Sequence, residues 1–115
     1  MNAEKIKEMT DAQLKNYIEF LGSSVSIFAM QKEKLKSAFD AEDYSSVIQW
    51  MKIIRNTLTR INADNLAADC EKQIDLNHNT SNIRHEKLEI FVAYLLASLS
   101  LLSDDIKTLD ISKQE

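Results

Sequence analysis

The sequence predicts an all-α protein, an antiparallel four-helix bundle, and two observations lead to this fold class. The 115 residues include no proline and a single glycine, Gly22, whereas a β-rich domain of this size needs more turn residues of both kinds. Apolar residues also recur every three or four positions through most of the chain, as they do on one face of a helix. The length suits one core, so residues 1–115 are expected to form a single domain, with 1–9 as a frayed N-terminal arm.

The first helix is expected at 11–39. Thr10 and Gln13 have the spacing of a capping box, which marks a helix start. The apolar positions that follow form one stripe at helical spacing: Leu14, Ile18, Leu21, Val25, Phe28, Leu35 and Phe39. The stripe keeps its phase across Gly22, so we expect one helix with a bend there, at a cost of about 1 kcal/mol for the glycine. Lys32 falls within the stripe, and its aliphatic stem is expected to pack while its amine reaches solvent.

The second and third helices are expected to form a hairpin at 44–61 and 64–76. Asp43 is a suitable N-cap for the second helix, because its carboxylate can accept hydrogen bonds from the first-turn amides. Asn62 is expected to take the left-handed conformation at the turn in place of glycine, and Asp64 is expected to cap the third helix. The inward-facing residues of the third helix are Leu66, Cys70 and Ile74.

The last helix is expected at 82–110, after a polar loop at 77–82. Its stripe is the most regular in the chain: Leu88, Val92, Leu95, Leu99, Leu102, Ile106 and Leu109, with Phe91, Leu96 and Leu101 widening the buried face. His85 lies three residues before Leu88, so it extends the stripe and is expected to be a partly buried structural histidine. His78 lies in the polar loop and is expected to be solvated. Four such helices joined by short links make an antiparallel bundle.

Composition argues against several classes of function. The net charge is −4, with both signs interspersed, and the lack of a basic stripe argues against nucleic acid as a partner. The apolar run at 90–102 is too short and too rich in serine to span a membrane, and the N-terminus lacks the apolar core of a signal peptide. A single cysteine, Cys70, excludes an internal disulfide framework and fits a reducing compartment. We therefore expect a soluble, cytoplasmic protein.

No pattern of catalytic residues is evident in the sequence. The two histidines and one cysteine are too scattered to form a metal site, so neither a metal nor a cofactor is expected. Ser98, Ser100 and Ser103 have no histidine paired with them in the manner of a hydrolase triad. No glycine-rich loop is present that could hold a phosphate group. The chain is therefore not expected to be an enzyme.

The second helix, at 44–61, has the most informative pattern. Its apolar face is formed by Tyr44, Val47, Met51, Ile54, Leu58 and Ile61. The opposite face is polar and contains Gln49, Lys52, Asn56 and Thr59, with Arg55 beside it. Trp50 and Ile53 lie to the side of the apolar face. Together with Ile48 they would form either the edge of the core or, if exposed, an apolar anchor for a partner.

This region resembles the central part of histidine-containing phosphotransfer (HPt) domains. In that family a His-x-x-Lys-Gly motif is followed by an Ile-Gly-Ala turn; here the same register reads Lys52-Ile53-Ile54-Arg55-Asn56 and then Ile61-Asn62-Ala63. The stretch INADNLAA, from Ile61 to Ala68, is similar to the family's Ile-Gly-Ala-Asp-x-Leu-Ala-Ala. The resemblance implies an HPt-like four-helix bundle. It also implies partners from two-component phosphorelay signalling, either a response-regulator receiver domain or a sensor histidine kinase.

The departures from the family pattern fall on its functional motif. Lys52 stands at the position of the phosphoacceptor histidine, Arg55 at the lysine one turn later, and Asn56 at the glycine that lets a receiver approach closely. A neutral imidazole can attack phosphorus near neutral pH, whereas a surface lysine, with a pKa of about 10.4, is protonated and has no free lone pair. The resemblance therefore predicts a binding module that transfers no phosphate, with Lys52 facing a receiver's acidic pocket.

The expected partner-binding residues all lie on this helix: Ile48, Gln49, Lys52, Ile53, Arg55 and Asn56. Two alternatives stay open. A working phosphorelay protein would use His85 as a displaced phosphoacceptor, since His85-Glu86 is similar to the His-Glu of histidine kinase dimerisation helices. A purely structural bundle would use an exposed apolar flank to form a homodimer. Acid-labile phosphate on His85 would identify the first alternative, and failure to capture a receiver domain would favour the second.

Overall fold

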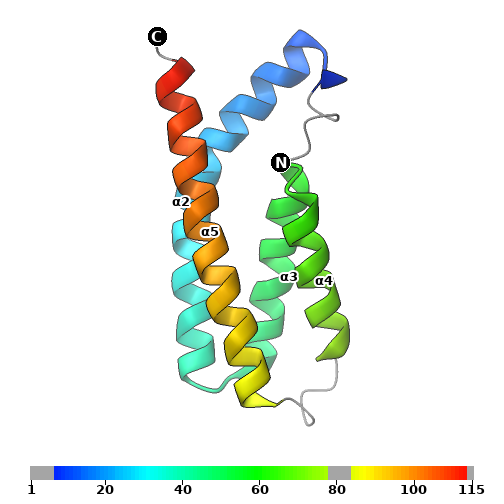
Figure 1. The fold of residues 1–115 in the computed structure, drawn as a ribbon, viewed down its shortest axis with the longest axis vertical. Coiled ribbons are helices and arrows are strands. Elements are labelled where there is room, and N and C mark those ends of the chain that lie inside the picture. Colours follow the sequence, from blue (N-terminus) through cyan, green and yellow to red (C-terminus); the bar gives the residue numbers. More distant parts are fainter. Residues whose placement is uncertain (1–6, 78–83, 114–115) are drawn as a thin grey trace.

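The structure is a computed structural model that describes residues 7–77 and 84–113, with side chains as far as Thr108. In these residues it contains no β-strand and four long helices: α2 (Asp11–Asp40), α3 (Tyr44–Arg60), α4 (Asp64–Leu76) and α5 (His85–Lys113). Successive helices run in opposite directions (Figure 1). The expected all-α, antiparallel four-helix bundle is confirmed. None of the described helices is long and apolar enough to cross a membrane.

The starts of α2 and α3 are fixed by the caps that the sequence predicted. Thr10 and Gln13 form a capping box: Thr10 Oγ1 accepts from the Gln13 amide (3.2 Å), and Gln13 Oε1 accepts from the Thr10 amide (3.0 Å). Asp43 caps α3, because its carboxylate accepts from both the amide (3.3 Å) and the hydroxyl (2.7 Å) of Ser46. These contacts satisfy amides that have no partner within the helix. Local sequence therefore sets both helix starts.

The turn between α3 and α4 was predicted correctly in its conformation but not in its cap. Asn62 takes a left-handed conformation with φ of 61°, and the Ala63 amide donates back to the carbonyl of Leu58 at 2.9 Å. Tyr17 of α2 fixes the turn by donating its hydroxyl to the carbonyl of Ile61 at 2.7 Å. The expectation that Asp64 caps α4 is wrong. Ala63 is the N-cap and makes no side-chain cap bond, while Asp64 lies in the first helical turn, where its charge favours the helix dipole.

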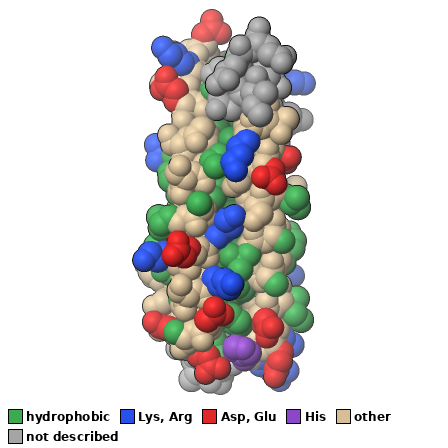
Figure 2. All heavy atoms as spheres, turned by 90° about the vertical axis from the view of Figure 1, so that its left-hand side faces the viewer, with side chains coloured by type: hydrophobic (Ala, Val, Ile, Leu, Met, Phe, Trp, Pro, Cys, Tyr) green, Lys and Arg blue, Asp and Glu red, His purple; other side chains and the backbone are tan. Residues whose placement is uncertain are grey.

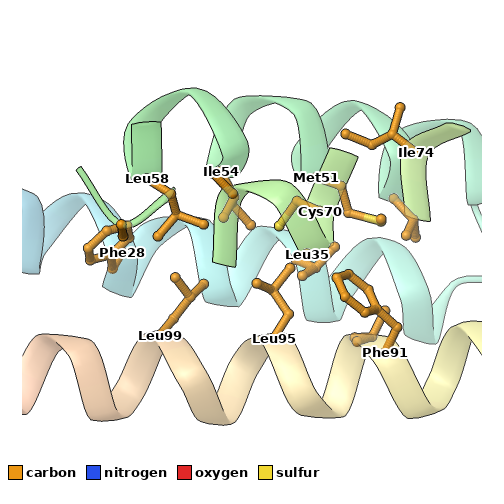
Figure 3. Close-up of a cluster of buried hydrophobic side chains, with 14 of the residues drawn as sticks. Phe28, Leu35, Met51, Ile54, Leu58, Cys70, Ile74, Phe91, Leu95 and Leu99 are labelled. Carbon is orange, nitrogen blue, oxygen red and sulfur yellow. The ribbon is translucent and has the colours of Figure 1, made fainter. Parts of the chain in front are cut away.

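The core lies where the four helices face one another. Figure 3 shows side chains from every helix pointing toward a common centre: Phe28 and Leu35 of α2; Met51, Ile54 and Leu58 of α3; Cys70 and Ile74 of α4; Phe91, Leu95 and Leu99 of α5. α3 packs against both α2 and α4, and α5 packs mainly against α2. α4 and α5 approach each other less closely, and a cleft opens between them.

α2 continues through Gly22 as expected, and its N-terminal part leans away from the long axis of the bundle (Figure 1). Two serines beside the glycine bond back to the helix. Ser23 Oγ donates to the carbonyl of Glu19 (3.2 Å), and Ser24 Oγ donates to that of Leu21 (2.6 Å). Hydroxyl groups bonded in this way bend helices, and glycine–serine pairs are frequent sites of bending.

The buried face of α2 includes a polar residue that the stripe did not predict. Gln31 is 1% exposed, and its Nε2 donates to Thr57 Oγ1 of α3 at 3.0 Å. Lys32, the next residue, is half-buried, and its Nζ donates to Ser100 Oγ of α5 at 3.0 Å. The lysine stem therefore packs as expected, but its amine has a partner on α5. Figure 2 shows basic side chains following the groove between two helices on this side of the molecule.

α5 runs from His85 to Lys113, so the expected bounds of 82–110 differ from the structure by three residues at each end. Among the described side chains, its expected core is correct except at Leu101. That side chain is 67% exposed, whereas Leu95 and Leu99 on the same helix are fully buried. The Leu109 side chain, residues 1–6 and the loop at 78–83 lie outside the described residues, and so does His78. The predictions made for the N-terminal arm and for the tip of this loop therefore stay predictions.

Candidate partner-binding face

The outward face of α3 presents the polar residues that the sequence predicted. Gln49, Lys52 and Asn56 are exposed, and Ile53 and Arg55 are half-buried at its edges. The apolar residues of the same helix turn inward because they lie on the opposite side of an amphipathic helix and pack in the core. We call these five residues the α3 outer face.

Lys52 is the exposed cation of this face. Within the described part of the chain, its side chain makes no salt bridge and no hydrogen bond. An ammonium group is a compact point charge with three donors and no acceptor. An ammonium group at this position can therefore attract an anion.

Arg55 was expected to add a second cation to this face, but its charge is already engaged. Its Nη1 forms a salt bridge with Glu71 Oε2 of α4 at 2.5 Å. Its Nε and Nη2 donate to Asn56 Oδ1 at 3.3 and 3.2 Å. The sequence did not identify Glu71 as part of the site, because the pair depends on how α3 and α4 pack. An acidic partner would have to compete with Glu71 for this guanidinium.

Ile48 does not belong to a surface, although it was predicted as a partner-binding residue. It is buried and is part of the hydrophobic core. Trp50 is half-buried and packs against that core, so it forms the edge of the core. Ile53 is half-buried and is the apolar residue of the predicted set that a partner could touch. The predicted apolar anchor therefore loses Ile48, whereas Trp50 and Ile53 both stay partly exposed.

His85 opens α5 and is half-buried, as expected of a structural histidine. Its ring stacks on Phe39 with centroids 4.7 Å apart, and its Nδ1 lies 2.6 Å from the hydroxyl oxygen of Tyr44. Carboxylates of Glu42 and Glu89 lie 4.0 Å from Nδ1 and 3.8 Å from Nε2. A phosphodonor is an anion and would approach against both carboxylates. This geometry favours the structural role over that of a displaced phosphoacceptor.

A cleft of about 370 Å³ lies between the start of α4 and the middle of α5. It is lined by Asn62, Ala63, Asp64, Asn65 and Leu66 on one side and by Ser98, Leu101, Leu102 and Asp105 on the other. The lining combines leucines with two carboxylates and contains no lysine or arginine, so it does not suit a phosphate group. The sequence did not predict this cleft, because its width depends on the separation of two helices.

The described residues contain no group of three or more His, Cys, Asp or Glu side chains that could hold a metal ion. No model of a protein family, no curated protein and no solved structure matches the chain. The resemblance to HPt domains therefore depends on the residues of α3 and of the turn that follows it.

Proposed function

We propose that the protein is an HPt-like binding module of two-component signalling, which engages a receiver domain through the α3 outer face and transfers no phosphate. One observation carries the proposal. Lys52 is an exposed ammonium group, without a partner in the described residues, at the position where the resemblance places the phosphoacceptor. A receiver domain is the partner of matching chemistry, because the resemblance implies an acidic pocket where the phosphoacceptor docks. A sensor histidine kinase is the other partner class that the resemblance implies.

The charge distribution predicts a contact that is modest in strength and sensitive to salt. Lys52 attracts an acidic pocket at long range, and this attraction fades as the Debye length falls from about 10 Å at 0.1 M salt to about 3 Å at 1 M. Arg55 contributes only if it exchanges Glu71 for a carboxylate of the partner. Replacing Glu71 with glutamine keeps the size of the side chain and removes the competing charge. Glu71→Gln is therefore expected to strengthen binding.

Asn56 decides how closely a partner can approach. Its amide oxygen accepts two hydrogen bonds from Arg55, so the side chain is held beside the guanidinium. Glycine at this position would leave more room but would cost helix stability, about 1 kcal/mol. Asn56→Gly is expected to be tolerated in binding. A large loss of binding in this variant would mean that the partner contacts the Asn56 side chain itself.

The proposal is tested by titrating receiver domains, with and without the beryllofluoride that mimics their phosphorylated state, against the full chain. Lys52→Ala is expected to weaken binding, and Lys52→Glu to weaken it more, because the second variant places like charge against the acidic pocket. Lys36→Glu is the matched control: Lys36 is exposed on α2 and the change in net charge is the same. Equal effects of the Lys36 and Lys52 variants would contradict docking at the α3 outer face.

The chemistry is tested separately by incubation with a phosphorylated receiver. The unmodified chain is expected to take up no label. Lys52→His places an imidazole at the position of the family's phosphoacceptor, and phosphate uptake by this variant would support a face that receivers can reach. Label on the unmodified chain that survives Lys52→Ala and disappears in His85→Ala would instead establish His85 as the acceptor and refute the proposal.

A further inference from the structure

The solvent face of α5 carries a row of exposed apolar side chains. Ile90 is 72% exposed, Tyr94 48% and Leu101 67%, and Ala97 is exposed between them. These four residues, the α5 stripe, follow the alternating four- and three-residue spacing of a helix that packs along a second helix. Soluble proteins usually expose apolar side chains singly, so a continuous row indicates a contact surface.

Charged residues of opposite sign continue the same spacing at both ends of the α5 stripe. Lys87 lies three residues before Ile90, and Asp104 lies three residues after Leu101. Both side chains are exposed, and neither makes a salt bridge within the described part of the chain. The row therefore has an apolar middle, a cation at one end and an anion at the other.

The row formed by Lys87, the α5 stripe and Asp104 is symmetric about the midpoint between Leu95 and Leu96. Residues at equal distances on the two sides of that midpoint form three pairs: Lys87 with Asp104, Ile90 with Leu101, and Tyr94 with Ala97. Each pair is complementary, either in charge, in apolar character, or in size. A twofold axis at this midpoint would bring the two members of each pair together from two antiparallel copies of α5.

We propose that the α5 stripe binds a second copy of this chain, with the two α5 helices antiparallel. In this arrangement Ile90 of each copy packs against Leu101 of the other, and Tyr94 against Ala97. Lys87 and Asp104 form an ion pair at each end. The occupant is a second copy because the row complements itself in all three pairs, which a surface shaped for an unrelated partner has no reason to do.

The surroundings of Tyr94 and Leu101 suit this packing. The Tyr94 hydroxyl donates to Asp69 Oδ2 of α4 at 3.0 Å, and its ring contacts Phe91 with centroids 5.9 Å apart. Its position is therefore fixed before a partner binds, which lowers the entropy cost of association. Leu101 lines the cleft between α4 and α5, so Ile90 of the second copy would lie beside a recess that can accept part of its side chain.

Charges beside the row add a further contact. Glu86 and Lys107 are both exposed and lie on the same flank of α5. Antiparallel pairing brings the same flanks of the two helices together, so Glu86 of one copy lies near Lys107 of the other. A contact along one helix is smaller than the standard protein interface of about 1,600 Å². The dimer is therefore expected to be in rapid exchange and to depend on protein concentration.

The experiment is a charge exchange followed by analytical ultracentrifugation over a range of concentrations. Lys87→Asp and Asp104→Lys each place like charges against each other twice per dimer, and each is expected to raise the dissociation constant about tenfold. The double variant restores opposite charges and is expected to recover most of the affinity. Lys36→Asp, on α2, is the control for net charge. A double variant as weak as the single ones, or a chain that stays monomeric at the highest concentration, would overturn the proposal.

A second measurement tests the register. Two copies of residue 97 would lie about 4.5 Å apart along the helix axis, on helices 8–10 Å apart. Ala97→Cys is therefore expected to be joined by a short bismaleimide, whereas Ala29→Cys, at an exposed alanine of α2, is not. Cys70 is buried and does not compete for the reagent. Equal cross-linking at positions 97 and 29 would refute the antiparallel α5 contact.

Discussion

Leu95 provides a quantitative test of how α5 faces the core. Its side chain is fully buried and points toward Leu35 and Ile54 in the centre of the bundle (Figure 3). Leu95→Ala removes the three carbon groups beyond Cβ. The burial of each contributes about 0.8 kcal/mol to stability, which gives a loss of about 2.4 kcal/mol in total. The cavity that is left adds to this loss, which brings the expected destabilisation to about 3–5 kcal/mol. For a domain whose total stability is typically about 5–15 kcal/mol, this is a large fraction.

The assay is urea unfolding followed by far-ultraviolet circular dichroism, at a protein concentration at which the chain is monomeric. Leu101→Ala is the matched control, because the substitution and the helix are the same but the side chain is 67% exposed. Its effect is expected to stay within about 0.5 kcal/mol. If the two substitutions lowered the free energy of unfolding by similar amounts, or if Leu101→Ala lowered it more, α5 would have to be rotated so that Leu95 does not face the core.

Two further predictions concern buried polar groups. Tyr17→Phe leaves the carbonyl of Ile61 without its 2.7 Å hydrogen bond, and chemical denaturation should show a loss of about 1–2 kcal/mol; an unchanged free energy of unfolding would show that this bond does not stabilise the turn. Burial raises the pKa of the Cys70 thiol to about 12. The protonated thiol therefore contributes fully to the stability of the fold below the pKa that the thiol has in the unfolded chain. This contribution is lost as the pH rises from that pKa through 12. Between about pH 8 and about pH 10.5, the free energy of unfolding of the unmodified chain should therefore fall by about 2 kcal/mol more than that of Cys70→Ala. Parallel pH profiles of the free energy of unfolding for the two proteins would contradict this.

The polar surface of α3 was predictable, but its partners were not. Gln49, Lys52 and Asn56 are exposed because they lie opposite the apolar residues of one helix, and this follows from helical periodicity alone. The salt bridge between Arg55 and Glu71 joins two helices. Their sequence separation gives no sign of it, because the contact depends on the relative rotation of α3 and α4.

Burial at the edges of each helix was the least predictable feature. A stripe in the sequence defines the centre of a buried face, but the neighbouring helices decide how far burial extends to each side. Ile48 lies at such an edge and is covered, whereas Leu101 lies at another and is exposed. The wide separation of α4 and α5 explains the exposure of Leu101, which lines the cleft between them.

The sequence by itself determined where α2 and α3 begin and how the chain turns between α3 and α4. The capping box at Thr10, the cap at Asp43 and the left-handed turn at Asn62 all involve residues within a few positions of one another, so their energies are local. Only the tertiary structure decided that Gln31 is buried and that Arg55 is paired. These features depend on which side chains of different helices meet, and packing over the whole bundle sets that arrangement.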